Sequence, residues 1–207
     1  MRVSKNYVDL EKIVAKTSNK HLGVGGIDTR GVARKIYPTS RWSNESKSIR
    51  KNNLALDVIG KREDGYHELE MIMAPITLHD LIYINTIASG IEIDSNSKIM
   101  PTDERNIMYK VVALMKERYN IKKGVKIFVY KHIPTQAGLA GGSADGAAVI
   151  KAMNKLFYLN LSNEEMAALG KEVGADIPFC IYQKIALVSG VGEKLKFIKN
   201  SLNVKYY

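Results

Sequence analysis

A glycine-rich stretch near the middle of the chain has the residue types and spacing of a loop that binds phosphate. Residues 134–148 read PTQAGLAGGSADGAA, between an apolar segment at 125–130 and an alanine-rich segment at 144–156. We expect the first segment to be a strand and the second to be a helix. The glycines let the backbone bend and approach a ligand closely. Unpaired N–H groups at the start of the helix then favour an anion, so the stretch predicts a phosphate-binding loop.

The stretch differs from two well-known loops of this kind. No Gly-Lys-Ser/Thr follows the glycines, which excludes a Walker A loop. The G-x-G-x-x-G pattern of dinucleotide-binding folds is also absent. Taken alone, the stretch is also compatible, as the less favoured alternative, with a glycine-rich turn that leads into a capped helix.

Two other stretches place a charged residue next to an apolar segment. Lys51 stands three residues before the apolar run 54–59, so its ammonium could project from the end of a strand into a cleft. Asp176 follows Gly174 and is surrounded by apolar residues in the run ADIPFC. Without further context, Lys51 would be a solvated surface lysine, and Asp176 would be a turn residue or a helix N-cap.

The three stretches together resemble the GHMP kinases, the family of galactokinase, homoserine kinase, mevalonate kinase and phosphomevalonate kinase. The pattern P-x(3)-G-L-x-G-G-S-x-D at 134–145 resembles the second motif of that family. Residues 51–69 and 174–180 are similar to the N-terminal signature and the catalytic-aspartate segment of the branch that phosphorylates 4-diphosphocytidyl-2-C-methyl-D-erythritol. The resemblance covers about residues 49–195.

The resemblance implies transfer of a phosphoryl group from ATP to a hydroxyl of a small-molecule substrate in the non-mevalonate isoprenoid pathway. Such transfers depend mainly on positioning and on charge stabilisation. It implies that Asp176 is the catalytic base and that Lys51 stabilises the charge on the transferring group. It also implies that Asn53 hydrogen-bonds the substrate, that Tyr66 stacks on the cytosine, and that His67 hydrogen-bonds the edge of that base.

The same resemblance implies which residues surround ATP. Asn106 and Lys131 correspond to positions near the adenine and the ribose, and Ser143 offers a hydroxyl to phosphate or magnesium. We expect Mg²⁺ to arrive with ATP. The four histidines and the single cysteine lack metal-ligand spacing, so no zinc site is expected. The expected cradle for the phosphates comprises Pro134, Thr135, Gln136, Ala137, Gly138, Leu139, Ala140, Gly141, Gly142, Ser143 and Ala144.

The elements that must position these residues mix strands and helices, which is typical of an α+β layer. Strands are expected at 54–59, 68–73, 81–86, 91–93 and 125–130, and a closing strand or hairpin is expected at 181–188. Helices are expected at 104–118 with Asp103 as N-cap, at 144–156, and at 162–173 with a Ser162/Glu165 capping box and Gly174 at its end. The resemblance implies the N-terminal GHMP domain, which is similar to the second domain of ribosomal protein S5.

Three regions are expected along the chain. Residues 1–48 form an atypical, poorly ordered basic extension, residues 49–195 form the GHMP N-terminal domain, and residues 196–207 begin a C-terminal ferredoxin-like domain that is otherwise missing. We expect the face left uncovered to favour self-association. Two departures from the family pattern stand out: Ser48-Ile49-Arg50 replaces a small-residue lead-in, and Gln183-Lys184 replaces a Gly-Gly turn.

The composition argues against a nucleic-acid-binding protein and against a membrane-spanning protein. The net charge is +10, but residues 1–50 hold eleven Lys/Arg and four Asp/Glu, whereas residues 51–207 hold twenty and seventeen. The domain is therefore nearly balanced, which argues against a nucleic-acid partner. One cysteine fits a reducing cytoplasm, and no run approaches the roughly 20 apolar residues of a membrane span.

Two alternatives remain open at this stage. Another GHMP small-molecule kinase is disfavoured by Tyr66-His67, which directly follows Gly65. An inactive or mispredicted fragment of such a kinase is favoured by the unusual N-terminal region and by the absence of a third glycine-rich motif.

Overall fold

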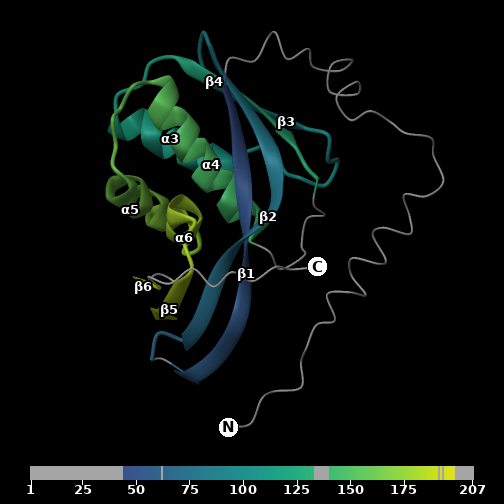
Figure 1. The fold of residues 1–207 in the computed structure, drawn as a ribbon. Helices are drawn as coiled ribbons and strands as arrows, with labels where there is room; N and C mark the ends of the chain where they lie inside the picture. Colours follow the sequence, from purple (N-terminus) through teal and green to yellow (C-terminus); the bar gives the residue numbers. More distant parts are fainter. Residues whose placement is uncertain (1–43, 62, 133–139, 191, 193, 199–207) are drawn as a thin grey trace, which may run out of the picture. The chain divides into compact units, whose positions relative to one another are not determined.

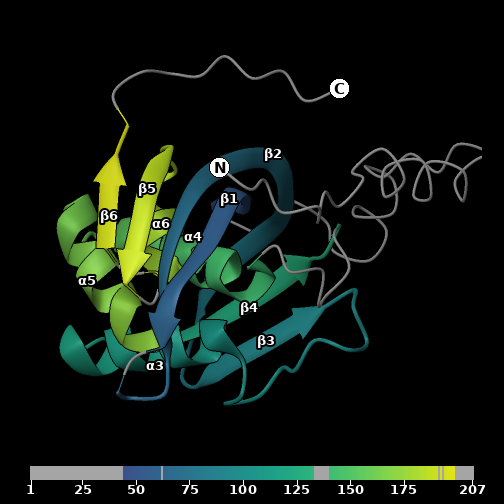
Figure 2. The same cartoon turned by 90° about the horizontal axis from the view of Figure 1, so that it is seen from below.

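The computed structural model describes residues 44–61, 63–132, 140–190, 192 and 194–198, which belong to one compact unit spanning residues 42–207. In this part of the chain a six-stranded sheet carries four helices on one face (Figure 1; Figure 2). The predicted α+β class is confirmed.

The sheet has the order β3-β4-β2-β5-β6, and β1 also pairs with β2. β3 pairs with β4 in parallel, and all other pairs are antiparallel. The strands are β1 (Asn44–Lys61), β2 (His67–Ile87), β3 (Ile91–Ser95), β4 (Gly124–Tyr130), β5 (Ala186–Gly190) and β6 (Lys194–Phe197). The helices are α3 (Ile107–Arg118), α4 (Gly141–Leu156), α5 (Asn163–Val173) and α6 (Ile177–Tyr182).

Helix α4 lies at the centre of the helical layer and contacts β1, β2 and the three other helices. A small residue permits one of these approaches, because a Cβ on Gly146 would lie 2.8 Å from Cγ2 of Ile107 in α3. Glycine costs a helix about 1 kcal/mol relative to alanine, but here it lets α3 pack closely. The core between the layers includes Ile82, Ile84, Val111, Met115, Ile127, Ile150 and Met153.

The hairpin of β1 and β2 is long, and its distal half extends past the helices (Figure 1). Its apolar side chains are therefore not covered by the core: Leu54, Leu56, Val58 and Ile59 are 39–62% exposed. The domain thus presents an apolar surface on β1, along the strand that follows Lys51.

Strand boundaries differ from expectation at two places. β1 begins at Asn44, upstream of the expected boundary at residue 49, and the side chain of Ser48 is fully buried. β2 is one continuous strand instead of the two expected at 68–73 and 81–86. The intervening Pro75 is tolerated because it lies at a register shift, where β1 passes from Ile49 to Lys51 while β2 passes from His79 to Pro75.

The three expected helices are present; the starts of two of them differ from expectation, and the third agrees. Asp103 does not cap α3; instead Asn106 accepts a hydrogen bond from the Met108 amide, and Asp103 binds Arg105. The helix expected from residue 144 begins at Gly141. The Ser162/Glu165 capping box is present, and the helix it opens ends at Gly174, as expected.

The strand or hairpin expected at 181–188 begins later than expected. The short helix α6 continues to Tyr182, and β5 begins only at Ala186. Pro178 lies in the first turn of α6, and a proline at that position is a typical signal of a helix start. The sequence prediction did not include this helix. Helix α6 ends at Gln183, whose φ of 53° lies in the left-handed region that favours glycine.

Replacing Gln183 with glycine should therefore stabilise the domain. The left-handed conformation costs a non-glycine residue about 1 kcal/mol, and Gln183→Gly should recover about that amount in urea unfolding. Ala168→Gly, on the exposed side of α5, should instead destabilise the chain by about 1 kcal/mol. Equal losses in both variants would contradict the assigned strain at residue 183.

Candidate active site

Lys51, Asn53 and Asp176, three of the residues expected at the site, lie together in the structure. The Lys51 ammonium lies 3.5 Å from Oδ2 of Asp176 and donates a hydrogen bond to Oδ1 of Asn53 at 3.0 Å. The Lys51 side chain is 7% exposed and that of Asp176 is 29% exposed. A buried ammonium thus stands beside a carboxylate that a ligand can reach.

Asp176 is held in place through the residue that follows it. It occupies the N-cap position of α6, but its side chain makes no capping hydrogen bond, so the structural role considered from sequence is not used. Ile177 is fully buried against three glycines. A Cβ on Gly146, Gly170 or Gly174 would lie 3.3, 2.3 or 3.5 Å, respectively, from the nearest Ile177 atom. Helices α4 and α5 and the turn before α6 therefore hold Ile177, and with it the backbone of Asp176, in a fixed position.

The start of α4 adjoins this pair. Ala140 takes the N-cap position with φ 51°, and α4 has no side-chain capping hydrogen bond at its start. A Cβ on Gly174 would lie 3.8 Å from the Ser143 hydroxyl, so the first turn of α4 meets the turn that leads to Asp176. Of the expected phosphate cradle, residues 134–139 lie outside the described residues, and Ala140 through Ala144 form the start of this helix.

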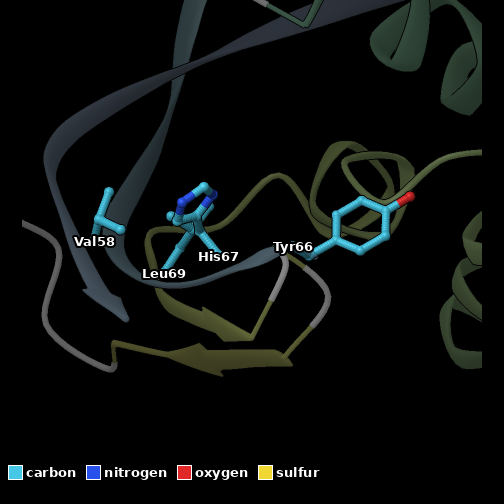
Figure 3. Close-up of a pocket in the computed structure, with 4 residues that line it drawn as sticks. All are labelled: Val58, Tyr66, His67 and Leu69. Carbon is cyan, nitrogen blue, oxygen red and sulfur yellow. The ribbon is translucent and has the colours of Figure 1, made fainter. Parts of the chain in front are cut away.

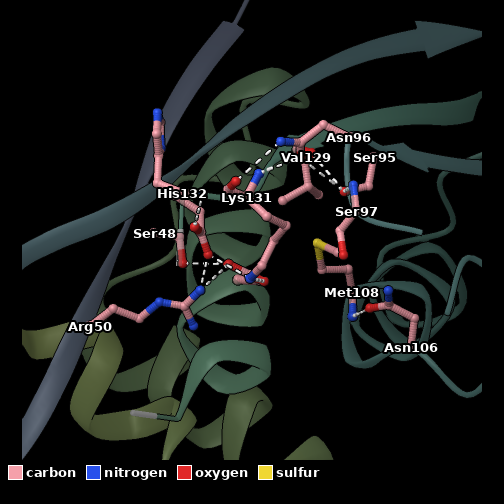
Figure 4. A network of polar contacts seen from close by, with 12 residues as sticks. Ser48, Arg50, Ser95, Asn96, Ser97, Asn106, Met108, Val129, Lys131 and His132 are labelled. Atoms are coloured by element: carbon pink, nitrogen blue, oxygen red, sulfur yellow. Dashed lines mark hydrogen bonds and ion pairs between the residues drawn. The ribbon is translucent and has the colours of Figure 1, made fainter. Parts of the chain in front are cut away.

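A buried charge network of Ser48, Arg50, Asp80, Lys131 and Asp145 lies beneath the helix start (Figure 4). Arg50 Nη2 donates to Asp80 and lies 3.7 Å from Asp145. Lys131 Nζ lies 2.5 Å from Asp80 and 2.8 Å from Asp145. Ser48 donates to Asp145 at 2.6 Å. The network joins β1, β2, α4 and the segment directly after β4.

Two of the residues expected near ATP, Lys131 in the network and Asn106 at the start of α3, are already engaged within the protein. Burial lowers the pKa of Lys131, while the nearby Asp145 opposes that shift. Its ammonium is already committed to two carboxylates. The Asn106 amide caps α3 and donates to the Pro101 carbonyl at 2.5 Å. Both side chains have structural partners, and their contact with ATP stays a prediction.

Cys180 lies close enough to Asp176 and Lys51 for their charges to act on its thiol. Burial raises the pKa of its thiol to about 12, with a further contribution from the charge of Asp176, while Lys51, Arg50 and Lys151 act in the opposite direction. A thiol with that pKa is neutral at physiological pH and does not act as a nucleophile.

Tyr66 and His67 line a pocket of about 330 Å³ with Val58 and Leu69 (Figure 3). The ring of Tyr66 points away from Val58 and His67 and is 65% exposed as a residue. Two of the three predicted substrate residues, Tyr66 and His67, are thus at the hairpin, whereas the third, Asn53, contacts Lys51.

A glycine turn connects the pocket with that pair. Leu69 of the pocket pairs with Gly190, and a Cβ on Gly192 would lie 3.8 Å from Oδ1 of Asp176. Both glycines have positive φ, 76° and 114°. Gly190 therefore lies next to the pocket and Gly192 lies next to Asp176. Neither glycine was assigned a role from the sequence.

Sequence reasoning also missed the network. Asp145 ends the glycine-rich pattern but received no function, and Asp80 is a lone acid within an apolar strand, a pattern that signals a buried partner. His79 and His132, taken as structural or surface residues, have ring centroids 6.4 Å apart, and the His132 amide donates to Asp80. Their structural interpretation fits these contacts.

The residues that the structure describes contain no group of three or more His, Cys, Asp or Glu side chains arranged to hold a metal ion. Within the same residues, no helix has the length and apolar character to cross a membrane.

Known proteins resemble this chain over most of the domain. Residues 106–184 match the family model described as the GHMP kinases N terminal domain. A Clostridium botulinum (strain Alaska E43 / Type E3) protein named 4-diphosphocytidyl-2-C-methyl-D-erythritol kinase is 51% identical over 153 residues, which cover 74% of this chain and 55% of that protein. A protein of the same name from Clostridium tetani is 50% identical over 149 residues, 72% of this chain and 53% of its own length. The chain spans about half the length of the curated relatives it matches.

Solved structures agree with these relatives. A crystal structure of 4-(cytidine 5'-diphospho)-2C-methyl-D-erythritol kinase superposes with a TM-score of 0.66 and 35% identity, over 75% of this chain and 55% of that chain. A mevalonate kinase structure superposes with a TM-score of 0.59 at 19% identity, over 76% and 56% of the two chains, and shares the fold. The expected GHMP N-terminal fold is confirmed.

Neutralising Asp80 should destabilise the domain strongly. Asp80→Asn leaves two buried cations with one carboxylate, which should lower the free energy of unfolding by about 3 kcal/mol in urea titration. Glu92→Gln removes a comparable ion pair on the surface, 2.8 Å from Lys126, and should cost less than about 1 kcal/mol. Similar small losses in the two variants would show that the network adds little.

The single cysteine should report on folding. Because Cys180 is 2% exposed and its thiol has a pKa of about 12, a disulfide reagent at pH 8 should label the native chain far more slowly than the urea-unfolded chain. Labelling at the same rate in both states would contradict the buried, neutral thiol.

Proposed function

The chain contains a GHMP kinase N-terminal domain, and from this premise we propose that it transfers a phosphoryl group from ATP to a hydroxyl of 4-diphosphocytidyl-2-C-methyl-D-erythritol. The observation that carries the proposal is the Lys51–Asp176 pair, 3.5 Å apart and next to the start of α4. The relatives that bear this substrate in their names are 50–51% identical to the chain.

In the proposed reaction Asp176 accepts the proton of the substrate hydroxyl. The hydroxyl oxygen then bonds to the γ-phosphorus of ATP, and ADP leaves with the electrons of the broken P–O bond. Lys51 lies where its charge stabilises the oxygens of the transferring group. Asn53 holds the ammonium in that position through its 3.0 Å hydrogen bond and leaves its own N–H₂ available to the substrate.

The proposed ATP site is the start of α4. Its first backbone N–H groups lack a side-chain cap, so they are available to phosphate oxygens. Mg²⁺ bound with ATP would neutralise charge on the phosphates, and the Ser143 hydroxyl in the first turn of α4 would offer it a ligand. We place this reaction in the cytoplasm, which supplies ATP and keeps the lone thiol reduced.

The proposed site for the cytidine is the pocket on the hairpin. His67 offers a ring nitrogen for the edge of the base, with Val58 and Leu69 as apolar walls. The exposed ring of Tyr66 points away from His67 in this structure and would turn toward the pocket to stack on the base. The glycine turn at Gly190 and Gly192 then spans the distance to Asp176, as a diphosphate-linked substrate would.

Asp176→Asn tests the catalytic assignment. Substrate-dependent release of ADP from ATP and Mg²⁺ should fall about 10²- to 10⁴-fold because the proton acceptor is lost. Binding of ATP should change little, and Glu92→Gln should keep the wild-type rate. An unchanged rate in Asp176→Asn would exclude the aspartate as base. Folded wild-type chain that releases no ADP above background would favour the alternative of an inactive fragment.

A further inference from the structure

We propose that Arg50 is a phosphate ligand: its guanidinium, lying beneath the first turn of α4, binds a phosphate group of the nucleotide held at that helix start. The identity of the anion as a nucleotide phosphate rests on the proposed kinase function. The guanidinium itself is assigned from contacts of this chain alone.

Arg50 is buried but only partly satisfied. Its side chain is 1% exposed, and Nη2 is engaged with Asp80. Nε and Nη1 have no hydrogen-bond partner in the described part of the chain. Figure 4 shows one amino group of Arg50 on the dashed contacts and the other outside them. Unpaired donors at this depth are rare in folded proteins, so a group outside the described contacts is expected to supply the acceptor, and the proposal assigns that place to a phosphate oxygen.

The unpaired nitrogen faces the helix start. A Cβ on Gly141 would lie 2.3 Å from Nη1 and 3.1 Å from the guanidinium carbon, so Nη1 rests against the first residue of α4. The N–H of Ala144 bonds to the Ala140 carbonyl, whereas the N–H groups before it are beyond the reach of such a bond. Backbone donors and the arginine fork therefore converge on one place.

Asp80 does not by itself explain an arginine here. Lys131 lies 2.5 Å from Asp80, and the His132 amide donates to it at 2.8 Å, so this carboxylate has other donors. What arginine adds over a lysine is a planar fork whose two sides can serve two anions at once. One side holds Asp80, and the other points toward the place where phosphate would lie.

The proposal also gives two consecutive cations of β1 different roles. Arg50 and Lys51 are both buried because the strand register shifts between Ile49 and Lys51. Lys51 faces Asp176, the site of the transferred group, whereas Arg50 faces the helix start. Arg50 would hold the phosphate chain, and Lys51 would act on the group that leaves it.

Binding measurements with Arg50→Lys test the assignment, because lysine keeps the charge opposite Asp80 and removes the second side of the fork. Isothermal titration would use three probes: ATP, inorganic tripolyphosphate and adenosine. Arg50→Lys should bind ATP and tripolyphosphate about 10- to 100-fold more weakly and bind adenosine as the wild type does. Arg118→Lys, at an exposed arginine paired with Glu172, is the matched control and should change none of the three.

Each outcome decides the proposal. Equal or tighter binding of tripolyphosphate by Arg50→Lys overturns it, while leaving the kinase proposal intact if the wild type binds ATP. Wild-type chain that binds tripolyphosphate through Arg50 but not ATP overturns the kinase proposal alone. Wild-type chain that binds neither overturns both.

A measurement on the wild type covers the case in which Arg50→Lys does not fold. Buried Arg50 should give a slowly exchanging Nε–H signal in a ¹⁵N-arginine spectrum. That signal should move when tripolyphosphate is added, and a saturating addition that leaves it in place overturns the assignment.

Discussion

The buried charge network limits how the domain can assemble. Asp80 and Asp145 are withdrawn from water, and a buried carboxylate without a well-placed cation costs several kcal/mol. Their partners come from distant parts of the chain, since Ser48 and Asp145 are 97 residues apart. The charges are compensated only when β1, β2, the end of β4 and α4 are all in place. A one-residue slip of β1 would turn Ser48 and Arg50 to the other face and leave both carboxylates short of donors.

The same constraint explains how a strand can present two adjacent cations to one side. Strict alternation would send Lys51 to the face opposite Arg50. The register shift opposite Pro75–His79 breaks that alternation, so both side chains are buried toward the helices. Arg50 then belongs to the framework beneath α4, and Lys51 belongs to the reactive pair. The irregularity in the hairpin is what allows one strand to serve both.

Local signals in the sequence predicted the parts of the fold that are decided locally. The capping box at Ser162 and the helix end at Gly174 need only their own neighbours, and both were found. Asp103 and Asn106 have similar capping chemistry, so the sequence alone could not choose between them. The burial of Arg50 was out of reach for another reason. It depends on a register shift and on Asp80, 30 residues away.

The position of Asp176 also depends on residues that are distant in the sequence. A carboxylate on a six-residue helix has little local support, because a helix of that length is marginal on its own. Ile177 supplies the missing anchor by filling the space left by Gly146, Gly170 and Gly174. Gly170 in α5 and Gly146 in α4 make the close approaches, at 2.3 and 3.3 Å, so a methyl group at either would press on the residue next to the aspartate, whereas Gly174 leaves ordinary contact distance. The glycines that accommodate Ile177 thereby help to place Asp176 next to Lys51. The positions of glycines in the sequence therefore matter for this site as well as the positions of charged residues.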